Sequence, residues 1–339
     1  MNVNISRMQF FLFLFVAQSG TVFISFQSPL ILAAGRDAWV IFIVASFLHY
    51  GLLLFYERHY KQFELGPVIS WLYKGYWLYL TVSFISYIDY SLAVWAFPKT
   101  PQFIVIAIMV GVSLYANLSR AETAMNISVI LIPMIPLFIF FLLLAWSKYE
   151  WTYLFPIGEA TRSEWIKGLL KTQFTFLGIE LFLVYRKYVD SDRQVKGWPL
   201  FSYHIIWMFF FLFTVIVSLL FFSVEELELI PEPLMYILKS QHVTFVERLD
   251  LFFIYIWMTW SIITIILFSF TALFVHRLHF KENRKRDTII FHLLLLLLPL
   301  FFLTKESSER LENSLVYVHL FFAIVLPIII IFKNRRKTV

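Results

Sequence analysis

The stretch FTFLGIELFL, residues 174–183, lies inside a long apolar run and yet holds a glycine, Gly178, and a carboxylate, Glu180. Both residues are costly in such a place. Glycine is about 1 kcal/mol less favourable than alanine inside a helix. A carboxylate at the centre of a bilayer costs about 2.5 kcal/mol or more. The two together indicate a membrane-crossing helix that is interrupted at this point.

The composition of the whole chain indicates a membrane protein. Of its 339 residues, 60% are hydrophobic and 15% are charged, and the mean hydropathy is +0.77. A soluble domain carries about 25% charged residues. The formal net charge of +6 comes from basic residues in short loops between apolar runs, so it indicates membrane topology rather than nucleic-acid binding. We therefore expect an all-α polytopic membrane protein.

Ten apolar segments have the length of membrane-spanning helices. They are residues 8–32, 38–56, 75–97, 102–118, 124–146, 165–188, 199–223, 250–276, 288–303 and 314–332. Lysine and arginine are enriched in the loops on the side that holds both termini, which places both termini in the cytoplasm. The longest loop, about residues 224–249, is acidic. We expect it to be a solvated cap, and a role in collecting cations is the alternative.

Ten spans divide into five plus five, and an odd number of spans in each half gives the halves opposite orientations. Many secondary transporters have this inverted repeat and bind substrate where the first helix of each half is broken. The two candidate breaks correspond, because Gly20 in QSGT (18–21) and Gly178 in LGIE (177–180) lie at similar depths. We expect one transmembrane domain, residues 1–339, with repeats at about 8–146 and 165–332 and with spans 1 and 6 broken.

Several stretches resemble the spore germination permease family, the B subunits of nutrient germinant receptors. They are ISRMQF at 5–10, SGTVF at 19–23, SPLILAAGRDAW at 28–39, FPKTP at 97–101, Phe176, Gly178 and Glu180, and ERLDLFFIYIW at 247–257. The resemblance covers nearly the whole chain. One departure is Gln27, at a place where the family commonly has proline; here Pro29 follows.

The resemblance implies a fold similar to that of the amino acid–polyamine–organocation transporters. It also implies the inner membrane of a bacterial endospore and two partners, an A subunit and a lipoprotein C subunit. The B subunit is thought to bind the germinant, often an amino acid, and to act as a sensor.

Candidate ligand-binding residues cluster near the two breaks. Gly20 and Gly178 would give a ligand access to backbone groups, with Thr21 beside the first. Glu180 would bind a germinant amine or hold a water path; the alternative is that it only bonds neighbouring backbone. Tyr87, Tyr90 and Thr264 would shape the pocket, and Asp89 and Ser261 are further candidates.

Other polar residues in the spans have structural interpretations. Lys171 is expected to extend towards the outer surface. Trp257 fits an interfacial aromatic belt. His49, His204 and His292 lie in separate spans and are interpreted as isolated core histidines without metal-ligand spacing.

The sequence thus favours a germinant-sensing receptor subunit on a transporter scaffold, bound to the lipid bilayer and to its partner subunits. The alternative is a secondary transporter that moves an amino acid with H⁺ or Na⁺. A third interpretation is a scaffold that binds no nutrient. No catalytic triad, nucleotide loop or metal-ligand pair is found, so we expect neither an enzyme nor a cofactor.

Overall fold

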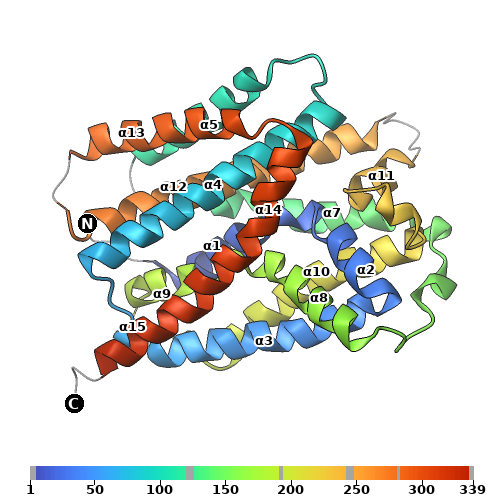
Figure 1. Cartoon of the computed structure of the whole chain (residues 1–339), viewed down its shortest axis with the longest axis horizontal. Helices are drawn as coiled ribbons and strands as arrows, with labels where there is room; N and C mark the ends of the chain where they lie inside the picture. The colour runs from blue at the N-terminus through green and yellow to red at the C-terminus, as the bar shows by residue number, and fades with distance from the viewer. Residues whose placement is uncertain (1–4, 120–125, 191–193, 242–247, 281–282, 336–339) are drawn as a thin grey trace.

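The computed structural model describes residues 5–119, 126–190, 194–241, 248–280 and 283–335 (Figure 1). Within these ranges the chain is helical, and the one β-type pairing is an isolated bridge between Ile5 and Val189. The predicted all-α class is confirmed for this part of the chain.

The α-helices are described in chain order. They are α1 (Arg7–Ser19), α2 (Gln27–Ala34), α3 (Ala38–His59), α4 (Pro67–Trp95), α5 (Gln102–Leu118), α7 (Met134–Leu143), α8 (Arg162–Thr172), α9 (Leu181–Tyr185), α10 (Trp198–Phe221), α11 (Pro233–Lys239), α12 (Leu249–Arg277), α13 (Arg284–Leu297), α14 (Lys305–Leu320) and α15 (Leu326–Arg335). Short 3₁₀ segments join them: η1 (Val22–Ile24), η2 (Gly35–Asp37), η3 (Tyr60–Gln62), η4 (Ile127–Leu131), η5 (Trp146–Lys148), η6 (Trp151–Leu154), η7 (Gln173–Phe176), η8 (Arg186–Tyr188), η9 (Glu226–Glu228) and η10 (Leu298–Phe301). A π-helical turn, η11 (Phe321–Val325), connects α14 to α15.

Six helical runs in the described part are long and apolar enough to cross a membrane. They are Gln27–Gln62, Pro67–Trp95, Arg162–Tyr188, Trp198–Phe221, Leu249–Arg277 and Lys305–Arg335, with shorter apolar helices at Gln102–Leu118 and Ile127–Leu143. The chain is therefore an integral membrane protein. All ten predicted segments contain helix, but their crossing of the membrane as two inverted halves stays a prediction.

The last helix begins earlier than residue 314. It starts at Lys305, where the Thr304 side chain accepts a hydrogen bond from the Ser307 amide. Because its first turns carry charged residues, they do not belong to an apolar run and were not included in the predicted span.

The first helix is interrupted at Gly20, as predicted. After α1 the chain passes through Gly20 and η1 before α2 begins. A helix break leaves carbonyl groups without backbone partners. α12 donates to the carbonyl of Gly20 and also to that of Val16, which already accepts from the Gly20 amide at 2.9 Å. Ser261 Oγ donates to the Gly20 carbonyl and Thr264 Oγ1 to the Val16 carbonyl, both at 3.0 Å. The two helices are so close that a Cβ on residue 20 would lie 1.7 Å from Thr264 Oγ1.

The second interruption is at Gly178. After α8 and η7 the backbone reaches φ +96° at Gly178, a value that favours glycine. A Cβ there would lie 3.1 Å from Phe268 Cζ on α12 and 3.5 Å from the Ala17 carbonyl carbon on α1. The two breaks therefore lie beside each other and against α12.

The helices form a bundle around α12 and α4, which pack along each other (Figure 1). α5 and α13 cover one side of this pair, and α3, α8 and α10 lie on the other. The start of α1 and the end of α15 lie at the same end of the bundle (Figure 1).

Candidate ligand-binding site

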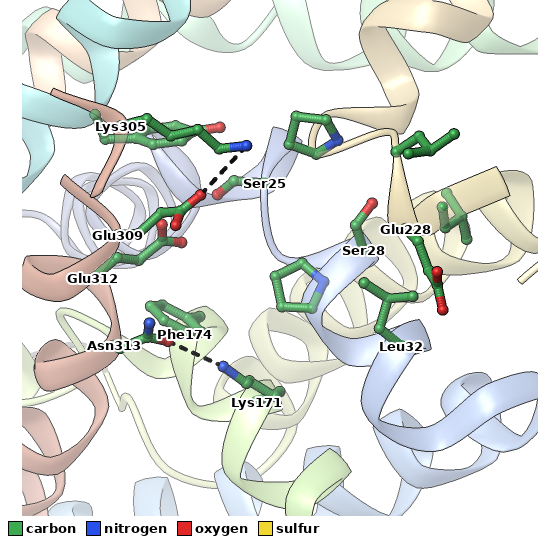
Figure 2. A pocket seen from close by; sticks show the side chains of 15 residues that line it. Ser25, Ser28, Leu32, Lys171, Phe174, Glu228, Lys305, Glu309, Glu312 and Asn313 are labelled. Carbon is green, nitrogen blue, oxygen red and sulfur yellow. Dashed lines mark hydrogen bonds and ion pairs between the residues drawn. The ribbon is translucent and has the colours of Figure 1, made fainter. Parts of the chain in front are cut away.

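A cavity of about 400 Å³ lies between the first break, α8, α14 and the segment that precedes α11 (Figure 2). It is called the outer cavity here. Its lining residues are Ser25, Ser28, Pro29, Leu32, Tyr87, Lys171, Phe174, Leu227, Glu228, Leu229, Pro231, Lys305, Glu309, Glu312 and Asn313. Its volume is in the range of small-molecule pockets, about 300–1,000 Å³.

Charged side chains of both signs line the outer cavity. Figure 2 shows Glu309 and Glu312 next to each other on α14, with Lys305 on one side and Lys171 on the other. Lys305 Nζ lies 3.8 Å from Glu309, and Lys171 Nζ donates to Asn313 Oδ1 at 3.3 Å. Such a wall can hold a small molecule that carries both an ammonium and a carboxylate group.

A narrow neck continues from the outer cavity to the first break. It has a volume of about 20 Å³ and shares Ser25, Tyr87, Phe174 and Glu312 with the outer cavity. This is room for one water molecule, which needs about 10–15 Å³. At its inner wall the Thr21 hydroxyl is buried and has no hydrogen-bond partner among the described residues. Buried hydroxyl groups normally have one, so the neck ends at a polar group whose hydrogen bond is not made.

The acidic loop is not simply a solvated cap. Glu232 is 1% exposed and accepts hydrogen bonds from the Tyr87 hydroxyl at 3.0 Å, Ser91 Oγ at 2.5 Å and Trp95 Nε1 at 2.6 Å. The prediction is therefore wrong for this residue, whose three donors on α4 hold the loop over the outer cavity. Glu225 is exposed, and hydrogen bonds from its own backbone amide and from Ser223 lower the pKa of its carboxyl group.

The predicted site residues separate into three groups. Thr21 and Tyr87 line the neck, and Tyr87 also lines the outer cavity. Gly20, Ser261 and Thr264 form the contact between the first break and α12. The third group lies away from the outer cavity: Tyr90, Asp89, Gly178 and Glu180.

Glu180 follows the second break, immediately before α9, and is fully buried. One carboxylate oxygen accepts from Trp77 Nε1 at 3.0 Å, and the other lies 3.9 Å from His319 Nδ1. His319 in turn contacts the Tyr76 hydroxyl at 3.1 Å. The carboxylate thus joins the start of α9 to α4 and α14.

Asp89 forms a helix–helix contact. It accepts a hydrogen bond from Gln102 Nε2 at 2.8 Å, at the start of α5. Asp89 was a further candidate for ligand binding, and the hydrogen bond gives it a structural role between α4 and α5.

The description of His49 and His204 as isolated is wrong. Their Nδ1 atoms lie 3.2 Å apart, and His49 Nε2 lies 3.2 Å from Gln18 Nε2, next to the first break. His292 contacts Ser113 Oγ at 3.1 Å. In the described ranges no three His, Cys, Asp or Glu residues are placed to hold a metal ion.

The acidic and basic residues of α14 were missed by the sequence analysis. Glu309 follows Lys305 by four residues, and Glu312 and Asn313 follow Glu309 by three and four, so the four side chains share one helix face. That spacing was a readable signal, but these residues preceded the expected start of the span.

Comparison with known proteins agrees with the resemblance seen in the sequence. A family model described as spore germination protein matches residues 4–310. Among curated proteins, the spore germination protein GerQB of Bacillus cereus is 22% identical over 350 residues, which cover 95% of this chain and 94% of the relative. Lys305 and Glu309 fall inside the family match, whereas Glu312 follows it.

Proposed function

Because the chain belongs to the spore germination protein family, we propose that it is the B subunit of a nutrient germinant receptor. A small nutrient, an amino acid, binds in the outer cavity and triggers germination. The observation that carries this proposal is the mixed-charge wall at Glu309, Glu312 and Lys171, continued by a neck that ends at the unpartnered hydroxyl of Thr21.

In the proposed arrangement the chain is one domain of ten spans, built as two inverted halves with spans 1 and 6 broken. The interruptions at Gly20 and Gly178 support this plan, as does the position of the start of α1 and the end of α15 at one end of the bundle (Figure 1). Both termini then lie in the cytoplasm, and the outer cavity opens to the opposite face of the spore inner membrane. An A subunit and a lipoprotein C subunit complete the receptor.

The ligand ammonium is held by Glu309 and Glu312, and its carboxylate by Lys171. Thr21 and Tyr87 contact the part of the ligand that enters the neck, which must widen because it now has room for about one water molecule. Gly20 and Gly178 allow the two breaks, and Glu180 fixes the inner side. A ligand that binds the widened form better shifts the receptor towards it.

The test uses spores in which this receptor is the only one present, screened with single amino acids. For the best germinant, Glu312→Gln should raise the concentration for half-maximal germination about tenfold or more, since a hydrogen bond to a charged group contributes about 1.5–3 kcal/mol and about 1.4 kcal/mol is a factor of ten. Thr21→Val should raise it by a smaller factor. Glu306→Gln is the control, because Glu306 is exposed on the same helix and does not line the outer cavity.

An unchanged dose response in Glu312→Gln and Thr21→Val spores with normal receptor levels would show that the outer cavity is not the nutrient site. Loss of germination in either variant, with the receptor assembled at normal levels, would exclude the interpretation of the chain as a scaffold that binds no nutrient.

The second candidate function is secondary transport of an amino acid with H⁺ or Na⁺. The two adjacent helix breaks favour it, because transporters bind substrate and ions at such places. Uptake of labelled amino acid by the purified chain in proteoliposomes, driven by an ion gradient, would establish transport.

A further inference from the structure

A second cavity, far from the outer cavity in the fold, lies in a groove between the first turns of α4 and α13. Its volume is about 300 Å³, and its lining residues are Trp71, Lys74, Gly75, Leu78, Asp287, Ile290, Phe291 and Leu294. Both helices begin at the end of the bundle that holds the start of α1 (Figure 1). This feature is called the α4–α13 groove.

The lower part of the α4–α13 groove is apolar and open. Ile290 is 50% exposed and Leu294 is 40% exposed. Gly75 has no side chain to fill the space, and a Cβ added there would meet nothing within 4 Å. In an integral membrane protein, an open apolar groove along two helices is suited to an acyl chain.

The upper part is polar and carries one charge of each sign. On α4, Lys74 Nζ lies 4.7 Å from the centre of the Trp71 ring, a cation–π contact, and Trp71 packs against His276 at 4.5 Å. On α13, Asp287 is 9% exposed. Asp287 and Leu294 are separated by about 10 Å along the helix, at about 1.5 Å per residue, so the groove runs from a polar end to an apolar end.

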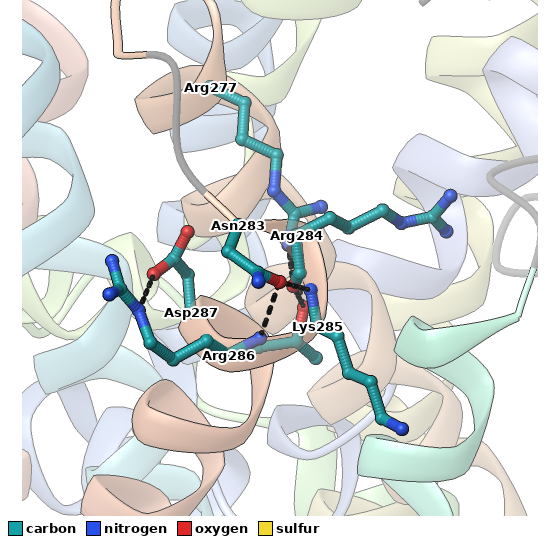
Figure 3. A network of polar contacts seen from close by, with 7 residues as sticks. Arg277, Asn283, Arg284, Lys285, Arg286 and Asp287 are labelled. Atoms are coloured by element: carbon teal, nitrogen blue, oxygen red, sulfur yellow. Dashed lines mark hydrogen bonds and ion pairs between the residues drawn. The ribbon is translucent and has the colours of Figure 1, made fainter.

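Asp287 is incompletely satisfied by its protein neighbours. Arg286 reaches only Oδ1, at 3.5 Å, and Oδ2 is buried without a hydrogen-bond partner among the described residues. Figure 3 shows Arg286 on one side of Asp287, while Arg284 and Lys285 point elsewhere. Asp287 Oδ2 thus lacks a hydrogen-bond donor among the described residues. A buried carboxylate oxygen without a donor is unfavourable by about 1–3 kcal/mol or more, so a ligand that supplies the donor would be stabilised here.

We propose that the α4–α13 groove is a binding site for phosphatidylethanolamine. The ammonium group of this lipid donates to Asp287, its phosphate pairs with Lys74, and one acyl chain lies over Gly75 between Leu78 and Leu294. Phosphatidylcholine has a cation without N–H donors, and phosphatidylglycerol has no cation. Phosphatidylcholine therefore carries both charges but cannot donate a hydrogen bond to Asp287, and phosphatidylglycerol has no cation to place beside it.

The test is lipid retention by the purified full-length chain. The protein is exchanged against equal amounts of phosphatidylethanolamine, phosphatidylglycerol and phosphatidylcholine, and bound lipid is counted by native mass spectrometry. We expect one retained phosphatidylethanolamine, preferred about fivefold or more over each competitor. Phosphatidylglycerol lacks one charge contact at the membrane surface, and phosphatidylcholine lacks the hydrogen bond to a charged acceptor.

Two substitutions locate the site. Gly75→Leu fills the groove and should abolish retention. Gly51→Leu is its matched control, an exposed glycine within α3 where a Cβ also meets nothing within 4 Å. Asp287→Asn should remove the preference for phosphatidylethanolamine over phosphatidylcholine while a lipid is still retained, which also covers the case in which Gly75→Leu fails to fold.

Equal retention of the three lipids by the unmodified chain would overturn the proposal. A preference for phosphatidylglycerol that Asp287→Asn leaves unchanged would overturn it as well, in favour of a general acidic-lipid site. Retention that survives in a folded Gly75→Leu variant would place the lipid elsewhere.

Discussion

Gly20→Ala is the substitution that tests most directly how the first break is held. The new Cβ would lie 1.7 Å from Thr264 Oγ1, 2.8 Å from Thr264 Cβ and 3.1 Å from the Trp260 carbonyl oxygen. Carbon atoms in good contact are about 3.5–4.0 Å apart. Thr264 cannot turn away freely, because its hydroxyl donates to the Val16 carbonyl at 3.0 Å. Overpacking a core costs about 1–3 kcal/mol, and we expect a loss near the upper value, about 3 kcal/mol.

A double-mutant cycle with Thr264→Ala identifies the contact. Alone, Thr264→Ala removes the hydrogen bond to Val16 and should cost about 1 kcal/mol. In the double variant the clash with Oγ1 is gone, while the contacts with the Thr264 Cβ and the Trp260 carbonyl remain. The double variant should therefore lose about 1–2 kcal/mol less stability than the sum of the losses in the two single variants.

The free energy of unfolding of the purified chain, measured by denaturant titration in micelles, is the readout. Gly111→Ala in α5 is the control, since a Cβ there meets nothing within 4 Å. It should be neutral or stabilising by up to about 1 kcal/mol through helix propensity. Additivity within about 0.5 kcal/mol, or a Gly20→Ala variant as stable as Gly111→Ala, would refute the close contact between the first break and α12.

Three further predictions concern other contacts. Gly178→Ala should lower the free energy of unfolding by about 1–2 kcal/mol, the cost of a left-handed backbone for a residue with a Cβ. Adding Phe268→Leu should not restore the melting temperature, because the strain lies in the backbone at φ +96°. Arg186→Lys should lower the free energy of unfolding by about 1–3 kcal/mol, since lysine cannot reproduce the two hydrogen bonds of 2.6 and 2.9 Å to Glu57. In the unmodified chain, 1 M salt should change the stability of this ion pair little, because both side chains are only about one-tenth exposed. Glu232→Gln should speed limited proteolysis within residues 223–231, because the charged acceptor for three donors on α4 is lost, whereas Glu225→Gln, at an exposed position, should leave the cleavage rate unchanged.

The two interruptions were predictable from local sequence. The chain has only 10 glycines, so two of them at matching depth beside polar residues stood out against the apolar spans. The bounds of α5, Gln102–Leu118, were also predicted, because Pro101 precedes an uninterrupted apolar run.

The partners of buried polar residues could not be predicted in the same way. His49 and His204 are far apart in sequence and meet only because α3 packs against α10. Glu232 belongs to an acidic loop in which Glu225, Glu226 and Glu228 are exposed, and its burial depends on three donors from α4. In each case sequence gives the cost of burying the group, whereas only the fold gives the group that offsets it.

Glu180 illustrates how the two kinds of information combine. Its carboxylate lies away from the outer cavity, against Trp77 on α4 and near His319 on α14. The same two helices line the outer cavity through Tyr87 and Glu312. Glu312 and His319 are seven residues apart within α14, which places them on one face about 10 Å apart along the axis. In the proposed function, a ligand held by Glu312 therefore contacts the helix that also positions His319 beside Glu180, so α14 connects the outer cavity to the second break.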